Sequence, residues 1–100
     1  MKRRVETEAA LERWCVARAR ARGWLSRKMN GLGFRDWPDR LFVRPPGPSG
    51  FRRPIWVEFK RAGGRPTDAQ AHLHAELRRR GDRVEVIDDR RRFVEEVLDV

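Results

Sequence analysis

Hydrophobic and polar residues recur with two different periods along this 100-residue chain. Leu11, Cys15 and Ala19 follow helical spacing within Val5–Arg22, a stretch without glycine or proline. Gly23 comes directly after it, where a helix commonly ends. The pattern therefore predicts an amphipathic first helix whose apolar stripe packs against the rest of the fold.

Four short segments have the apolar content or the two-residue alternation that is typical of strands. They are Trp24–Met29, Arg40–Arg44, Ile55–Lys60 and Arg83–Ile87. Pro38 stands at the entrance to the second segment, where a proline removes no hydrogen bond from the sheet. The segment Pro45–Pro54 is rich in proline and glycine, which predicts a long connection between two antiparallel strands.

Two more helices are predicted in the second half of the chain. Thr67-Asp68-Ala69-Gln70 has the form of a capping box and opens a helix that runs to about Arg80, with Leu73 and Leu77 facing inward. Arg90–Leu98 closes the chain as a helix with an apolar packing face. The resulting order, α-β-β-β-α-β-α, predicts an α/β fold with one mixed β-sheet flanked by helices.

The composition predicts one domain, over residues 1–100, with a thin core. Hydrophobic residues make up 39% of the chain and charged residues another 39%, a balance that favours self-association. The formal net charge is +9, from 24 Lys and Arg against 15 Asp and Glu. Such an excess attracts polyanions, chiefly nucleic acid. A basic domain without a nucleic-acid partner is the alternative.

Cys15 is the only cysteine, so no internal disulfide can form. We therefore expect an intracellular, reducing location, either in the cytoplasm or associated with the nucleoid. A phage origin of the protein is compatible with this location. Within the amphipathic stretch, Cys15 is predicted to be a small core side chain rather than a nucleophile. No apolar run approaches the ~20 residues that span a bilayer. The basic N-terminus also lacks the hydrophobic segment of a signal peptide, and no membrane partner is expected.

Charged residues stand at the ends of two predicted strands. Asp39 precedes one strand, whereas Glu58 and Lys60 end the other and, being two positions apart, project to the same face. If the two strands are antiparallel, Asp39 lies beside Glu58. Two carboxylates at one site repel each other unless a cation lies between them or one stays protonated, and their oxygens suit Mg²⁺ or Mn²⁺.

With a lysine and a basic background beside them, these acids predict a site for phosphodiester cleavage. A metal polarises a phosphate oxygen and lowers the pKa of bound water, while the surrounding positive charge holds the polyanion. The alternative is an ordinary Glu–Lys pair at a sheet edge, with Asp39 stabilising the turn after Pro38.

These residues belong to a longer pattern. It consists of Arg35-Asp36-Trp37-Pro38-Asp39-Arg40, Trp56-Val57-Glu58-Phe59-Lys60, Gly63-Gly64 and Gln70. In this order the pattern resembles the VRR-NUC branch of the PD-(D/E)xK nuclease superfamily, and the resemblance extends from the first helix to the strand near Val84. It implies a restriction-endonuclease-like core and metal-dependent cleavage of DNA that leaves a 3′-hydroxyl and a 5′-phosphate.

The resemblance also implies the roles of individual residues. Asp39 and Glu58 correspond to the family's metal-binding acids, and the backbone carbonyl of Phe59 completes the metal shell. Lys60 corresponds to the catalytic lysine, which positions or activates water. The implied cofactor is Mg²⁺ or Mn²⁺, and the implied activity is that of a deoxyribonuclease.

Four further acidic or amide residues enter through the same resemblance. Family members carry a glutamate on the first helix that approaches the metal, often through water; Glu12 is the first choice and Glu8, one turn away, the second. Gln70 matches a glutamine at the start of the second helix, and it can serve the capping box alone or face the active site. Asp36 stands where the family has a small residue. We expect its side chain to form a turn or to be solvated, rather than to act as a supplementary ligand.

Basic side chains around the proposed site are candidates for phosphate contacts, which position nucleic acid without reading its sequence. They are Lys28, Arg52, Arg53, Arg61 and Arg65. The runs Arg78-Arg79-Arg80 and Arg90-Arg91-Arg92 are expected to contribute general positive charge. His72 and His74 point to different faces of their helix, so they form no metal pair, and His74 is expected to be partly buried. Trp37, next to the acids, is the tryptophan to test for DNA contact.

The resemblance finally implies a homodimer, because free-standing family members of this size are typically dimeric. A two-fold dimer places two active sites on opposite strands, which suits branched DNA such as a Holliday junction. Three alternatives stay open at this point: a non-catalytic basic binding module, a nuclease subunit that works with a helicase or another DNA-processing partner, and an RNA substrate.

Overall fold

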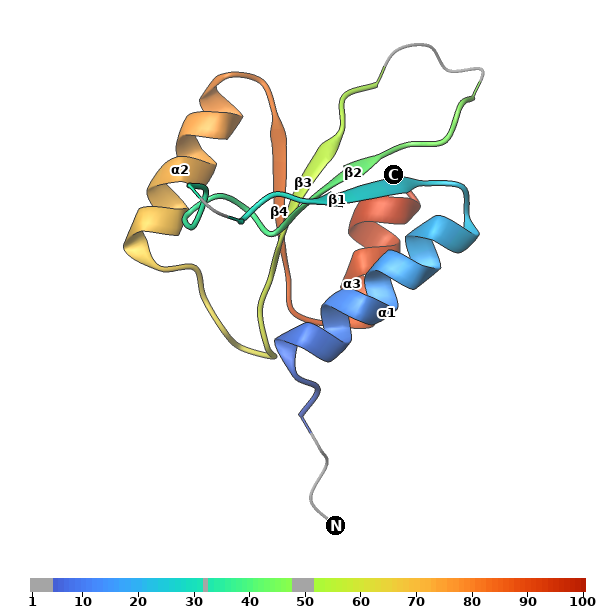
Figure 1. Cartoon of the computed structure of the whole chain (residues 1–100), viewed down its shortest axis with the longest axis horizontal. Coiled ribbons are helices and arrows are strands. Elements are labelled where there is room, and N and C mark those ends of the chain that lie inside the picture. The colour runs from blue at the N-terminus through green and yellow to red at the C-terminus, as the bar shows by residue number, and fades with distance from the viewer. Residues whose placement is uncertain (1–4, 32, 48–51) are drawn as a thin grey trace.

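The computed structural model describes residues 5–31, 33–47 and 52–100, and Figure 1 shows how their helices and strands are arranged. The order α-β-β-β-α-β-α confirms the predicted α/β fold. The tip of the predicted Pro45–Pro54 loop, residues 48–51, lies outside the described residues. No helix in the three described ranges is long and apolar enough to cross a membrane. The elements are α1 (Glu8–Ala21), β1 (Leu25–Lys28), β2 (Arg40–Val43), β3 (Ile55–Phe59), α2 (Asp68–Arg79), β4 (Arg83–Ile87), α3 (Arg90–Phe93) and the π-helical turn η1 (Val94–Leu98).

The two longer helices begin at side-chain caps. The first helix starts at Glu8 rather than at the predicted Val5, because the hydroxyl of Thr7 accepts a hydrogen bond from a backbone N–H of the first turn at 3.1 Å. The predicted capping box of α2 is confirmed, with Thr67 and Gln70 each accepting a backbone N–H of the other. These caps fix where α1 and α2 enter the fold.

The last helix differs from the prediction in its second half. Arg90–Leu98 is α-helical only for its first turn and then widens into a π-helix, closed by a 2.9 Å hydrogen bond from the N–H of Asp99 to the carbonyl of Val94. The wider turn buries the consecutive side chains of Val97 and Leu98 in the core. An apolar pattern alone does not distinguish this turn from a regular helix.

The four strands form one mixed sheet in the order β1-β2-β3-β4. The first two pairings are antiparallel, and β4 runs parallel to β3 on the other edge. Between β2 and β3, Arg40 is opposite Val57 and Leu41 is opposite Trp56. Continued by one residue, this register sets Asp39 opposite Glu58, so the hairpin brings the two predicted acids together.

The helices cover the two faces of the sheet separately. In Figure 1, α1 and α3 lie on one face and α2 lies on the other. All of β3 is buried, and its alternation divides it: Ile55, Val57 and Phe59 join the larger core with α1 and α3, whereas Trp56 packs in a smaller cluster with α2. Glu58 is in phase with Trp56 and therefore points toward α2.

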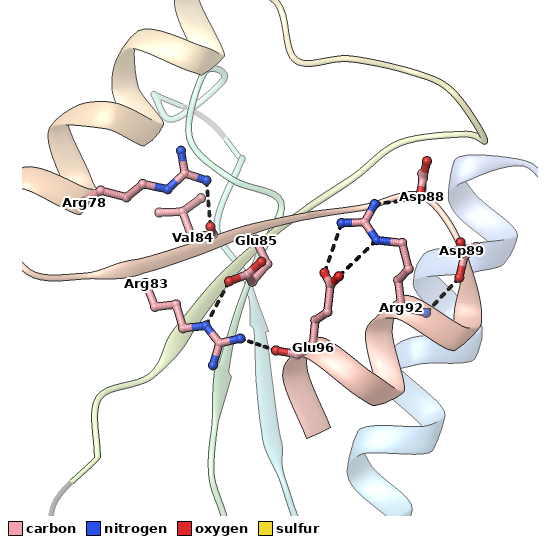
Figure 2. A network of polar contacts seen from close by, with 8 residues as sticks. All are labelled: Arg78, Arg83, Val84, Glu85, Asp88, Asp89, Arg92 and Glu96. Carbon is pink, nitrogen blue, oxygen red and sulfur yellow. Dashed lines mark hydrogen bonds and ion pairs between the residues drawn. The ribbon is translucent and has the colours of Figure 1, made fainter. Parts of the chain in front are cut away.

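Ion pairs attach the C-terminal helix to the sheet (Figure 2). Arg92 contacts Asp88 at 2.9 Å and Glu96 at 3.0 Å, and Arg83 contacts Glu85 at 2.9 Å and donates to the backbone carbonyl of Glu96. We call these five residues the C-terminal network. It joins β4 to α3 and η1 through arginines that are paired with acidic side chains of the chain.

Candidate active site

Asp39 is held at the start of β2 by two hydrogen bonds. Its Oδ2 accepts the backbone N–H of Phe59 at 2.7 Å, across the hairpin, and its Oδ1 accepts the side-chain amide of Asn30. Pro38, the residue before it, is fully buried. Because the contact with Phe59 comes from the strand that carries Glu58, the carboxylate of Asp39 is fixed beside the end of β3.

Glu58 is almost completely buried, with 2% of its surface exposed. Its Oε2 lies 3.4 Å from the side-chain amide of Gln70 and 3.7 Å from the ammonium of Lys60. Its Oε1 is buried and accepts no hydrogen bond within the described part of the chain. A buried carboxylate with an unpartnered oxygen is costly, and such groups usually have a functional reason.

The protonation of Asp39 is shifted by burial and by the neighbouring carboxylates. Burial and the negative charges of Glu58 and Glu12 together raise the pKa of Asp39 from 3.8 to about 7, against the hydrogen bond from Phe59, which lowers it. Without a cation, Asp39 therefore holds a proton far above the pH at which an ordinary aspartate loses it. Strongly raised carboxyl pKa values are typical of functional sites.

Lys60 and Gln70 lie against Glu58. The ammonium of Lys60 is 3.1 Å from Oε1 of Gln70, and the same oxygen accepts the backbone N–H of Thr67 at 2.9 Å. Gln70 thus serves the capping box and faces Glu58 at the same time, so its two predicted placements are both present. Its position at the start of α2 orients the lysine and the glutamate together.

Glu12 reaches the neighbourhood of the site from α1. Its Oε2 lies 2.7 Å from Nε of Arg40 and 3.4 Å from Nζ of Lys28, so it is paired with cations. Its charge nevertheless acts on Asp39. Glu8, one turn earlier, is exposed. Lys28, a candidate for phosphate contact, is held by this acid in the present arrangement.

His74 is a site residue that the sequence analysis missed. It was expected to be partly buried, but it is only 1% exposed, and its Nε2 lies 3.6 Å from Oε1 of Glu58. Nε2 has no hydrogen-bond partner in the described residues. The available signal was its spacing of one helical turn from Gln70, which places both side chains on one face of α2.

The candidate phosphate-binding side chains differ in whether they already form ion pairs within the chain. Arg61 and Arg65 are exposed on the connection between β3 and α2, and Arg52 is exposed before β3. Arg53 forms an ion pair with Asp82. Several arginines expected to supply general charge are paired within the chain instead. These are Arg79 and Arg80 with Glu76, Arg90 with Glu6, Arg91 with Glu95, and Arg92 with Asp88 and Glu96.

A cavity of about 390 Å³ lies between the loop before β2 and α2, and neither Asp39 nor Glu58 lines it. Asp36, Trp37 and His72 line it, so Asp36 faces this cavity. The ring centroids of Trp37 and Trp56 are 5.3 Å apart, so Trp37 belongs to the smaller cluster and also forms part of the cavity wall. Cys15, by contrast, is completely buried, and burial raises its pKa to about 12, which fits the predicted core role.

The donor set at the acids fits a hard divalent cation. Asp39 and Glu58 supply two adjacent carboxylates, one with an unpartnered oxygen, and Lys60 is the one cation in contact with either of them among the described residues. No group of three or more His, Cys, Asp or Glu side chains in the described ranges is arranged to hold a metal. Mg²⁺ commonly takes one or two carboxylates and keeps several waters, so this pair is sufficient.

Comparisons with known proteins bear on the fold and the family of the chain. No family model matches the sequence. The chain is 35% identical over 85 residues to "Putative nuclease p44" of Acyrthosiphon pisum secondary endosymbiont phage 1, covering 85% of this chain and 86% of that protein. A solved structure described as a VRR_NUC domain matches with a TM-score of 0.77 and 25% identity, over 94% of this chain and 98% of that one. The chain therefore belongs to the VRR-NUC family, whose motifs its P-D and E-x-K segments resemble.

Proposed function

We propose that this protein is a Mg²⁺- or Mn²⁺-dependent DNA endonuclease. The observation that carries the proposal is the meeting of Asp39, Glu58 and Lys60 at one end of the β2–β3 hairpin. The similarity to a phage protein named as a nuclease supports the same class of reaction. An intracellular site of action, with access to DNA, goes with this proposal.

Asp39, Glu58 and the backbone carbonyl of Phe59 would hold the cation. Glu12 would reach it through water after releasing Arg40 or Lys28, and Glu8, one turn earlier on α1, is the second choice. When bound, a divalent ion polarises a phosphate oxygen and lowers the pKa of water. It would also remove the repulsion between the two carboxylates, so that Asp39 is ionised at neutral pH.

Lys60 provides a positive charge next to the reacting phosphate. Gln70 holds its ammonium at 3.1 Å, beside Glu58, where it orients the attacking water and stabilises charge that develops on the phosphate. The attacking water gives up a proton as its oxygen forms a bond to phosphorus, the bond from phosphorus to the 3′ oxygen breaks, and the 3′ oxygen takes up a proton in return. The products are a 3′-hydroxyl and a 5′-phosphate.

DNA approaches over the exposed arginines around the site. Arg52, Arg61 and Arg65 are placed to contact phosphates without reading sequence, and Lys28 joins them if it leaves Glu12. Arg53 has the same opportunity only when its pair with Asp82 opens. A net charge of +9 strengthens this attraction at low salt.

The protein acts as a homodimer on branched DNA in this proposal. Leu25 on the edge strand β1 is 70% exposed, and Val43, its direct partner on β2, is 38% exposed. An apolar pair at an open sheet edge supports contact with a second copy. Light scattering of the purified chain tests this step: a Leu25→Glu variant should be monomeric, and a monomeric parent chain contradicts the dimer.

A panel of labelled substrates tests the activity. Duplex, nicked, flap and four-way DNA, together with duplex RNA, are incubated with Mg²⁺ or Mn²⁺, and Glu58→Ala is the control. We expect metal-dependent cuts in DNA, fastest at the branched substrates, and none with the control. Binding without cleavage by the parent chain would identify a non-catalytic module, and cleavage only after addition of a helicase or another partner would identify a subunit.

A further inference from the structure

Two polar side chains are buried together between β3 and α2. Of the polar and charged residues that the structure describes, Glu58 and His74 are the fully buried ones, at 2% and 1% exposure. His72, two positions earlier on the same helix, is exposed. Burial of a polar side chain is unfavourable unless it finds a partner, so the position of His74 requires an explanation.

The unpartnered atoms of these two residues face each other. Nε2 of His74 lies 3.6 Å from Oε1 of Glu58, and neither atom makes a hydrogen bond to any other described residue. The separation is somewhat longer than a normal hydrogen bond. Hydrogen bonds at catalytic sites are often long in the empty protein and shorten when the site is filled.

α2 therefore approaches the carboxylate from two positions, one turn apart. Gln70 donates to Oε2 at 3.4 Å, while His74 is directed at Oε1. A carboxylate has about four acceptor positions on its two oxygens, so both contacts leave lone pairs for a cation. Two donors on one helix face would restrict rotation of the carboxylate to a single orientation.

We propose that His74 is a positioning residue for the metal ligand Glu58. Its Nε2–H donates to Oε1 and fixes the orientation in which Glu58 binds the divalent ion. The inference rests on the proposed metal-dependent function, but it concerns metal affinity and not the cutting step. Hydrogen-bond donors to metal-binding carboxylates commonly contribute about 10–100-fold to metal affinity.

Mn²⁺ binding to the full chain tests this role without DNA. Isothermal titration calorimetry and Mn²⁺ paramagnetic resonance measure the dissociation constant for the parent chain, His74→Leu and His74→Gln. The leucine removes the donor, and we expect about 10–100-fold weaker binding. The glutamine can place an amide N–H near the position of Nε2, and we expect it to restore binding to within about threefold. His72→Leu, on the exposed side of α2, is the matched control and should bind like the parent.

A second measurement separates positioning from a merely structural role. For His74→Leu, the Mn²⁺ concentration that gives half-maximal cleavage should rise in proportion to the dissociation constant, while the rate at saturating Mn²⁺ stays within a few-fold of the parent. Thermal unfolding in EDTA checks that the variants are folded. If His74→Leu does not fold, His74→Met, which also lacks the donor, takes its place.

The outcomes divide cleanly. Unchanged Mn²⁺ affinity in the donor-free variant, or a glutamine variant as weak as the leucine variant, overturns the inference. A parent chain that binds Mn²⁺ with the expected variant pattern yet cuts no nucleic acid contradicts the proposed function and leaves the role of His74 standing. A parent chain that does not bind Mn²⁺ contradicts both.

Discussion

Acidic residues are paired differently in the C-terminal network and in the proposed active site. In the network, Arg92 lies between Asp88 and Glu96, and these two acids raise the pKa of its guanidinium. At the active site, no arginine among the described residues contacts Asp39 or Glu58, and burial together with their mutual repulsion raises the pKa of Asp39 to about 7. The network is half-exposed, whereas Glu58 is buried.

The difference is informative because cations are abundant in this chain. With 24 Lys and Arg against 15 Asp and Glu, an arginine partner for the buried acids would be easy to provide. Lys60 is in contact with Glu58 instead, at 3.7 Å, and one carboxylate oxygen keeps no donor. Acids that are fully paired stabilise the fold, whereas acids left underpaired at a buried position are available to a ligand.

The largest expected effect comes from exchanging one acid in each region for its amide. Glu58→Gln removes a negative charge from the metal site, and we expect kcat/KM for DNA cleavage to fall by about 1000-fold or more, which is about 4 kcal/mol of transition-state stabilisation. Glu96→Gln in the network should leave the rate within about twofold. Steady-state cleavage with Mn²⁺ measures both, and comparable losses in the two variants would remove the distinction between the regions.

The second effect concerns stability and pH in the metal-free protein. Asp39 ionises near pH 3.8 when unfolded but at about 7 when folded. Between these values the unfolded chain releases a proton that the folded chain retains, so a rising pH favours unfolding through this window and stability stays low above it. The Asp39→Asn variant has no carboxyl group that titrates at this position. Its free energy of unfolding relative to the parent should therefore rise between pH 4 and pH 8, on the order of 4 kcal/mol at about 1.4 kcal/mol per pKa unit.

Urea unfolding in EDTA at several pH values measures this difference. Mn²⁺ should stabilise the parent at pH 8 and stabilise Asp39→Asn much less, because only the parent retains both of the acids that are proposed to bind it. If the difference in free energy of unfolding between the two proteins stays constant with pH, the ionisation of Asp39 does not destabilise the fold.

The third effect is smaller and lies in the network. Arg92→Ala removes contacts with Asp88 and Glu96, and we expect a loss of about 1 kcal/mol, because these pairs are partly screened by water. Arg91→Ala, which breaks a more exposed pair with Glu95, should cost less than Arg92→Ala, because water screens this pair more completely. Urea unfolding measures both, and cleavage should be unaffected. A loss of activity in Arg92→Ala would show that the network also supports the site.

Much of the fold was predictable because its signals are local. The capping box at Thr67 fixes the start of α2, and the alternation along β3 predicts that Glu58 and Lys60 share a face. The antiparallel pairing of β2 and β3 then brings Asp39 to Glu58. Each step depends on residues near one another in sequence or on one rule of strand pairing.

The rest depends on tertiary contacts that no local pattern contains. The burial of His74 follows from the rotation of α2 against the sheet, and its helical spacing from Gln70 permits this rotation without requiring it. The pairing of Glu12 with Arg40 joins α1 to β2 through side-chain rotamers, which spacing does not determine. The π-helical end of the chain similarly reflects what the core can accommodate around Val97.

The smallest expected effect distinguishes paired from exposed arginines on the DNA-binding side. Arg61 and Arg65 are exposed and have no ion-pair partner among the described residues, whereas Arg53 is already engaged by Asp82. Each phosphate contact contributes about 0.9 to the slope of log affinity against log salt concentration. Arg61→Ala or Arg65→Ala should therefore lower that slope by about one and weaken binding a few-fold, measured by fluorescence anisotropy in Ca²⁺ or EDTA over a range of salt.

Arg53→Ala is the matched control for that experiment, because its charge is already balanced within the chain. Its salt slope should stay close to the parent value, since no counterion is released from a phosphate that Arg53 does not touch. If Arg53→Ala lowers the slope as much as Arg61→Ala does, the pair with Asp82 opens on DNA. The rule that paired charges serve the fold and unpaired charges serve the substrate would then apply to the buried acids but not to the surface arginines.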